Sequence, residues 1–194
     1  KRKIDNIRNV NWQGTSETEV LLECLDCFGI EDTLNMAVGM FSMAILDKEQ
    51  DALILVRDRF GEKPLYYGFI GEGNERSLVF ASEIHAIKKN PFFEKKINEI
   101  SLDYFLRLSY IPNPLSIYKN IFKVKPGHML VFKLDEKFLF SQPKVIRWFC
   151  YEDLFLKNID SHYSSEKEAL YELDKAIKQS TLDQSVSDVP LGCF

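Results

Sequence analysis

The sequence predicts an α+β protein in which antiparallel β-sheets are covered by helices. Four apolar runs of strand length follow one another after Gly39, and polar or glycine-rich turns separate them. Segments with a helical period lie before and after these runs. Because the runs are almost continuously apolar, we expect both faces of the strands to be buried, which requires a covering layer on each side.

Composition narrows the classes of function. The 194 residues can form one domain with its own core and the beginning of another, and 45% hydrophobic residues with 28% charged residues are typical of folded proteins. The net charge is −4 without a basic stripe, so we expect no nucleic-acid partner. No apolar run approaches the roughly 20 residues that span a bilayer, so we expect no membrane partner and a cytoplasmic location.

The first long helix is predicted to begin at a capping box. Ser16 stands three residues before Glu19, so Ser16 should cap the helix and Glu19 should bond back to Ser16. Gly29 should end this helix, and a second short helix is predicted at residues 31–38. The apolar face of the first helix consists of Val20, Leu21, Cys24, Leu25 and Phe28.

Four strands are predicted next. Residues 40–46 and 53–56 flank a polar turn and should form a hairpin, and residues 64–70 and 77–81 flank the turn Gly71-Glu72-Gly73-Asn74. We expect these four strands to pair in antiparallel succession.

The rest of the chain is predicted to contain two short helices, a strand and a long helix, at residues 83–89, 102–108, 128–134 and 165–181. A polar stretch at residues 137–144 breaks the pattern before the last helix. The apolar face of that helix consists of Ala169, Leu170, Leu173, Ala176 and Ile177. We place a domain boundary between residues 148 and 149.

The cysteines and histidines indicate no metal or redox site. Four cysteines do not make a disulfide framework in a chain of this size. Cys24 and Cys27 form a C-x-x-C pair, but the pair lies inside a predicted helix and no second pair has zinc-ligand spacing. We interpret both as structural, and we assign no role to the isolated histidines His85, His128 and His162.

The densest motif is the segment R-D-R-F-G-E-K-P-L-Y-Y at residues 57–67. Alternating charges follow a predicted buried strand, and Gly61 can adopt the positive φ that a tight reversal before Pro64 needs. The residues alone leave two interpretations open. The charges could be an ion-pair network that holds the turn, or part of a functional site.

This segment is similar to a signature of the glutaminase domains of the asparagine synthetase family. Several other segments resemble that family in the same order along the chain, namely residues 39–44, 81–83, 110–114, 125–128 and 187–194. Several motifs in register are more specific than any single one. The resemblance covers about residue 12 to the last residue.

The resemblance implies an N-terminal-nucleophile hydrolase sandwich (α/β/β/α) that lacks its N-terminal part, followed by the first elements of an α/β ATP-pyrophosphatase domain. Residues 1–148 would be the partial glutaminase domain, and residues 149–194 would be a linker and the start of the ATP-binding domain. The family's nucleophilic Cys and oxyanion-hole Asn-Gly pair would precede Lys1. We therefore assign no catalytic residue and expect this stretch alone to lack glutaminase activity. Cys193 would be an ordinary buried residue.

One substrate-binding residue follows from the resemblance. The family's Ser-Asp-Thr-Glu motif, whose Asp pairs with the ammonium group of glutamine, matches Ser16-Glu17-Thr18-Glu19. Glu17 keeps the charge of that Asp and adds a methylene group. The alternative is that Glu17 is simply an acid favoured by the macrodipole in a first helical turn.

The implied function is that of a glutamine-dependent asparagine synthetase. Glutamine hydrolysis, which needs no cofactor, would supply ammonia, and ATP with magnesium would activate aspartate, giving asparagine, AMP and pyrophosphate. The expected partners are these small-molecule substrates, and a homodimer is left open. Two alternatives remain, an amidotransferase for another carboxylate and a non-catalytic binding or regulatory module. A Cys directly after the initiating Met would favour an enzyme.

Overall fold

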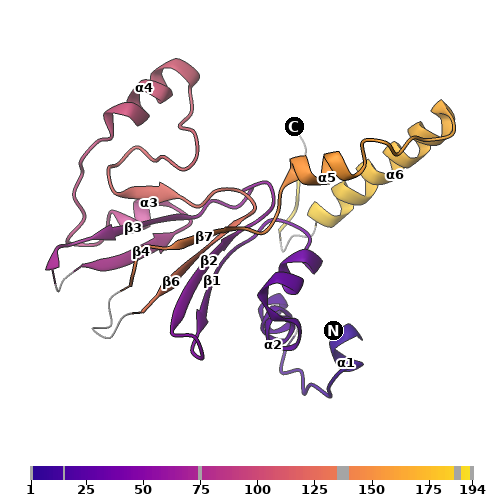
Figure 1. Ribbon diagram of the computed structural model, residues 1–194, viewed down its shortest axis with the longest axis horizontal. Helices are drawn as coiled ribbons and strands as arrows, with labels where there is room; N and C mark the ends of the chain where they lie inside the picture. Colours follow the sequence, from indigo (N-terminus) through magenta and orange to yellow (C-terminus); the bar gives the residue numbers. More distant parts are fainter. Residues whose placement is uncertain (1, 15, 74–75, 135–139, 186–188, 193–194) are drawn as a thin grey trace. The chain divides into compact units, whose positions relative to one another are not determined.

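The computed structural model describes residues 2–14, 16–73, 76–134, 140–185 and 189–192. The chain divides into two compact units, Lys1–Gly39 and Met40–Phe194 (Figure 1). The first unit contains the helices α1 (Arg2–Asp5) and α2 (Glu17–Met36). The predicted boundary at residues 148 and 149 is a different division and stays a prediction.

The predicted cap of α2 is present, with one change in its bonding. The Ser16 hydroxyl oxygen accepts a hydrogen bond from the backbone N–H of Thr18 at 3.2 Å. We expected Glu19 to bond back to Ser16, but its carboxylate accepts hydrogen bonds from the N–H groups of Gln13 (2.6 Å) and Gly14 (3.1 Å). The chain before the cap therefore runs close to the helix start, where its backbone N–H groups bind the Glu19 carboxylate in place of Ser16.

Gly29 interrupts α2 as the sequence predicts. Its φ of 76° and ψ of 177° are not helical, so α2 consists of two helical stretches joined by a kink. The left-handed region of φ is open to glycine at little cost, whereas a side chain would be strained there. The predicted stop and the predicted second short helix are both confirmed.

The second unit contains two antiparallel sheets. The four-stranded sheet has the order β1-β2-β6-β7, with β1 at Ser42–Asp47, β2 at Ala52–Arg57, β6 at His128–Lys133 and β7 at Lys144–Arg147. The three-stranded sheet has the order β4-β3-β5, with β3 at Tyr66–Ile70, β4 at Ser77–Ala81 and β5 at Ile121–Lys123.

Both predicted hairpins form, and so does the strand predicted at residues 128–134. The expected succession of four paired strands is wrong, because β2 pairs with β6 and β3 pairs with β5. Full burial is found in β2, whereas β1 and β4, which lie at the edges of their sheets, include exposed residues. The strands β5 and β7 were not predicted, since each has only three or four residues.

An apolar cluster joins the two sheets face to face. Its buried residues are Leu53, Leu55, Leu65, Val124, Leu130 and Phe132. The ring of Phe132 in β6 makes edge-to-face contacts with Tyr67 and Phe69 of β3, with centroids 5.9 and 6.1 Å apart. Alternate residues of β2 and β6 point to this interface, which makes the unit a sandwich of two antiparallel sheets.

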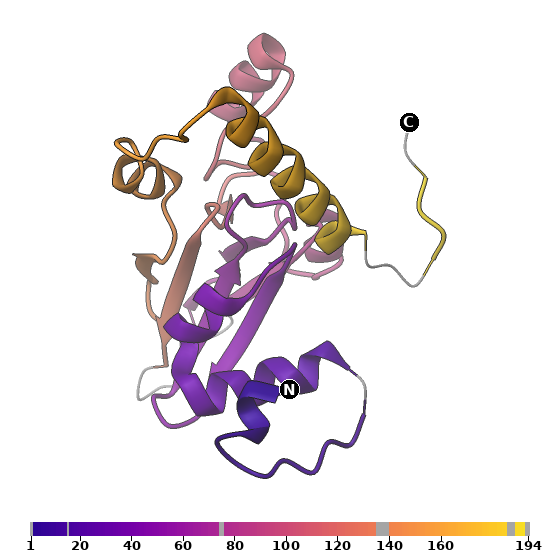
Figure 2. The ribbon, with the colours of Figure 1, turned by 90° about the vertical axis from the view of Figure 1, so that its right-hand side faces the viewer.

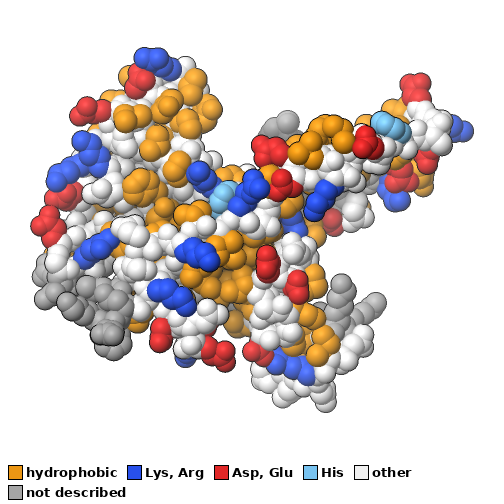
Figure 3. All heavy atoms as spheres, viewed as in Figure 1, with side chains coloured by type: hydrophobic (Ala, Val, Ile, Leu, Met, Phe, Trp, Pro, Cys, Tyr) orange, Lys and Arg blue, Asp and Glu red, His pale blue; other side chains and the backbone are white. Residues whose placement is uncertain are grey.

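The helices of the second unit are α3 (Ile84–Ile87), α4 (Glu99–Leu108), α5 (Tyr151–Lys157) and α6 (Glu166–Gln184). The last is one long helix (Figure 2) that is capped by Ser165, whose hydroxyl accepts a hydrogen bond from the N–H of Glu168 at 3.2 Å. No residue of α5 or α6 is buried. Hydrophobic side chains gather on the surface over α4 and α5 (Figure 3). No described helix is long and apolar enough to cross a membrane.

We predict that limited proteolysis cuts first between β7 and α6. The residues of α5 and the following segment up to Ser165 are exposed and contribute no buried side chain, so they should open at low free-energy cost. Mass spectrometry should find a protected fragment that contains residues 40–147. If α6 resists the protease as long as β2 does, α6 belongs to the same cooperative unit as the sandwich.

Candidate functional site

Asp58 follows β2 and organises the loop between the two sheets. It is 1% exposed, and both carboxylate oxygens accept hydrogen bonds from backbone N–H groups. Oδ1 accepts from Phe60 at 3.1 Å and from Glu62 at 3.0 Å, and Oδ2 accepts from Lys63 at 2.9 Å. One carboxylate thus satisfies three donors of the loop.

Arg57, the last residue of β2, binds the carbonyl groups of the same region. Its Nε donates to Lys63 O at 3.0 Å, Nη2 to Gly61 O at 2.5 Å, and Nη1 to Val124 O at 2.8 Å. Burial lowers the pKa of Arg57, and the negative charge of Asp58 opposes that shift. The guanidinium stays charged at neutral pH, because its ordinary pKa lies far above 7.

Gly61 lets the loop pass close to the guanidinium. Its φ is 69°, which confirms the predicted positive φ. A Cβ atom at this position would lie 3.0 Å from the Arg57 guanidinium carbon and 2.7 Å from the ring of Pro126. Position 61 therefore needs glycine for its conformation and for space.

The backbone of Asp58 connects three of the motif segments. The backbone N–H of Asp58 donates to Phe41 O at 3.0 Å, and Asp58 O accepts from the N–H of Gly127 at 2.8 Å. Segments 39–44, 57–67 and 125–128 therefore meet around Asp58. Of the two interpretations left open above, the geometry favours a network that holds the turn, since the side-chain bonds described for Arg57 and Asp58 are to groups of the protein itself.

Arg59 has a different role from its neighbours. Its guanidinium carbon lies 5.4 Å from the Trp148 ring centroid and 5.5 Å from that of Phe149, within cation–π range. Burial lowers the pKa of Arg59. The aromatic pair that follows β7 is thereby linked to the loop after β2.

Glu17 is the first residue of α2 and is exposed. Among the described residues its side chain makes no hydrogen bond or ion pair, so the carboxylate is available to a ligand. The Ser16 cap fixes where the helix begins and hence where Glu17 lies. Its place in the first turn also fits the macrodipole alternative.

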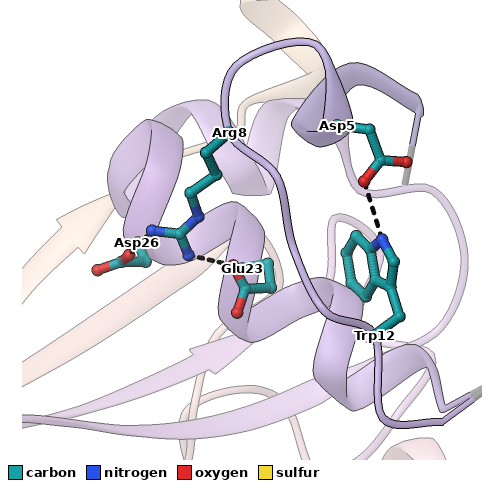
Figure 4. Close-up of polar contacts among 5 residues, drawn as sticks. All are labelled: Asp5, Arg8, Trp12, Glu23 and Asp26. Carbon is teal, nitrogen blue, oxygen red and sulfur yellow. Dashed lines mark hydrogen bonds and ion pairs between the residues drawn. The ribbon is translucent and has the colours of Figure 1, made fainter.

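Sequence reasoning missed a polar cluster in the first unit (Figure 4). The Arg8 guanidinium forms ion pairs with Glu23 and Asp26 of α2, and these two carboxylates, Glu23 more than Asp26, raise the pKa of Arg8. Trp12 Nε1 donates to Asp5 Oδ1 at 2.8 Å. The segment before α2 is thus fastened to the helix. Two acids three residues apart on one helix face were the only signal in the sequence.

Comparison with known proteins places these features in a family. The family model described as "Glutamine amidotransferase domain" matches residues 2–141. The chain belongs to this family. The chain is 31% identical over 188 residues to a putative glutamine-hydrolysing asparagine synthetase of Methanocaldococcus jannaschii. The aligned region covers 96% of the chain and 34% of that protein.

Two proteins of Bacillus subtilis named as glutamine-hydrolysing asparagine synthetases are also similar to the amidotransferase chain. One is 29% identical over 194 residues, covering 100% of the chain and 29% of that protein. The other is 31% identical over 157 residues, covering 78% of the chain and 20% of that protein. The chain therefore spans about a third or less of the length of these relatives.

The cysteines of the amidotransferase chain fit the structural interpretation where the structure describes them. Cys24, Cys27 and Cys150 are free and half-buried, and Cys193 lies outside the described residues. In the described part of the chain, no group of three or more His, Cys, Asp and Glu side chains could hold a metal ion.

We predict that Asp58→Asn destabilises the amidotransferase domain by about 2–4 kcal/mol. Asp58 uses both oxygens, so Asn would turn an amide N–H toward the N–H of Lys63 and remove the charge beside Arg57. Urea unfolding measures the loss.

Asp47→Asn is the matched control. Among the described residues, Asp47 accepts backbone hydrogen bonds through Oδ1 alone, from Glu49 at 3.0 Å and from Gln50 at 2.9 Å, and an amide oxygen can do the same. Its effect should stay below about 1 kcal/mol. Equal losses for the two variants would contradict the role assigned to Asp58.

Proposed function

We propose that this amidotransferase domain is the glutaminase part of a glutamine-dependent asparagine synthetase. The observation that carries the proposal is similarity along almost the whole chain to proteins named as glutamine-hydrolysing asparagine synthetases. In such an enzyme, glutamine hydrolysis supplies ammonia, and ATP with magnesium activates aspartate for conversion to asparagine. The domain itself would need no cofactor for glutamine hydrolysis.

In this proposal, residues 1–148 are glutaminase and residues 149–194 begin the ATP-using part. The absence of any buried residue from α5 and α6 supports the division. Leu154, Phe155 and Leu156 of α5 are 50–61% exposed, and Leu170 and Leu173 of α6 are 59% and 55% exposed. Apolar side chains exposed to this degree on neighbouring helices are typical of surfaces that another structure covers.

Glu17 is proposed to anchor the substrate by pairing with the ammonium group of glutamine. Two observations support this role: the helix start at Ser16 fixes Glu17 at the first helical position, and the carboxylate is exposed. A charge-assisted hydrogen bond between carboxylate and ammonium is stronger than one between neutral groups. The extra methylene of Glu, compared with the family's Asp, extends its reach.

Magnesium, ATP, a homodimer and a cytoplasmic location stay predictions for the whole protein. We assign no step through magnesium to the described residues. One alternative is an amidotransferase that acts on a carboxylate other than aspartate. Supplying ammonia directly and identifying the amidated product would distinguish this enzyme from an asparagine synthetase. The other alternative is a non-catalytic module, which would release no glutamate from glutamine.

We predict that Glu17→Gln, in the protein expressed from its complete reading frame, lowers kcat/KM for glutamine about ten- to a hundredfold. The ammonium of glutamine loses its charged partner, whereas synthesis from free ammonia does not use that site. Glutamate release and asparagine formation, each measured with glutamine and with ammonium chloride, separate the two effects.

Two further variants sharpen this test. Glu31→Gln removes an exposed acid from the same helix and should leave glutamine kinetics unchanged. Glu17→Asp restores the residue of the family motif and should retain most of the activity. If Glu17→Gln behaves like Glu31→Gln, Glu17 is a helix-terminus charge and not a substrate anchor.

A further inference from the structure

A cavity of about 270 Å³ lies beside Arg57, and its lining includes a second cation, Lys123. Lys123 in β5 is paired with Tyr66 in β3, and directly paired residues extend from the same face of a sheet. The lining contains no acidic residue. The cavity therefore has a positive charge without a carboxylate of its own.

Arg57 acts on this cavity mainly as a fixed charge, because most of its five N–H donors are engaged by the protein, and Nη1 also lies 3.5 Å from Oδ1 of Asn113 in the lining. Its Nε, Nη1 and Nη2 atoms all donate to backbone carbonyl oxygens, and its neighbour Asp58 has both oxygens engaged by backbone N–H groups. The guanidinium is therefore fixed in position in the cavity wall.

Lys123 has donors to spare. Its Nζ donates to the carbonyl oxygen of Ile111 at 2.6 Å, which holds the ammonium at the wall of the cavity. An ammonium carries three N–H donors, so two remain after this bond. Burial lowers the pKa of Lys123, and the nearby charge of Arg57 lowers it further. An anion at this position would relieve both effects.

The rest of the lining indicates the class of anion. Tyr66, Tyr110 and Asn113 supply polar groups, and Pro64, Leu65 and Pro112 supply apolar surface. Polar and apolar groups share the lining, and small-molecule sites combine both kinds of group. Such a wall suits an anion with a short aliphatic part better than an ion that is polar on every side.

We propose that this cavity binds a small carboxylate, with Lys123 as the direct cationic contact and Arg57 as a fixed charge behind it. The site uses neither Glu17 nor the chemistry of glutamine hydrolysis, so it stands or fails independently of the proposed function.

The test is calorimetric titration of the 194-residue chain with sodium glutarate at pH 7.5, against sodium chloride at equal ionic strength. Wild type should show saturable binding that chloride does not reproduce. Lys123→Gln should weaken it at least about tenfold, the effect of losing one charge-assisted contact. Lys125→Gln removes an exposed lysine two residues away and should bind as wild type does. Unchanged binding by Lys123→Gln, or none by wild type, would overturn the proposal.

A second measurement needs no variant and so does not depend on the folding of Lys123→Gln. Unmodified lysine side chains labelled with ¹³C are titrated by NMR with and without glutarate. Because the ammonium form binds the anion, glutarate should raise the pKa of Lys123, and affinity should fall as pH rises through that pKa. The pKa of Lys125 should not change. A Lys123 titration unaffected by glutarate would refute direct contact.

Discussion

The sandwich depends on how the chain crosses from one sheet to the other after β2. A reversal between two packed sheets places backbone N–H and C=O groups where water cannot satisfy all of them, and each unpaired group costs free energy. Two adjacent side chains solve this problem with opposite chemistry. Asp58 accepts from three N–H groups, and Arg57 donates to three carbonyl oxygens. Neither side chain could replace the other, since a carboxylate only accepts and a guanidinium only donates.

The crossing also explains why the strand order could not be obtained from the sequence. Antiparallel neighbours along a chain usually pair, and the hairpins β1–β2 and β3–β4 follow that rule. The link between the hairpins is long enough either to fold back or to cross. The crossing is held by the bonds of Arg57 to Val124 and of Asp58 to Gly127, which lie in segments more than 60 residues away. Local pattern contains no information about such partners.

Local signals were reliable wherever the determining groups are close in sequence. The cap at Ser16, the break at Gly29 and the turn at Gly61 each depend on a few neighbouring residues. Short strands were missed because β5 has three residues and little pattern to detect. The candidate sites divide in the same way. Glu17 could be placed from its motif, whereas the pairing of Lys123 with Tyr66 required the register of β3 and β5.

The position of Lys123 is a consequence of the same crossing. Two buried charges are costly unless hydrogen bonds satisfy their donors and acceptors, and the backbone does this for Arg57 and Asp58. The charges of Arg57 and Asp58 cancel in sum, but they lie at different positions, so a group nearer to Arg57 still experiences a positive charge. Arg57 is near enough to Lys123 to lower its pKa, while both oxygens of Asp58 are held by the loop. The network that closes the sandwich thus leaves a positive potential at one edge, beside a cavity that has no acid to balance it.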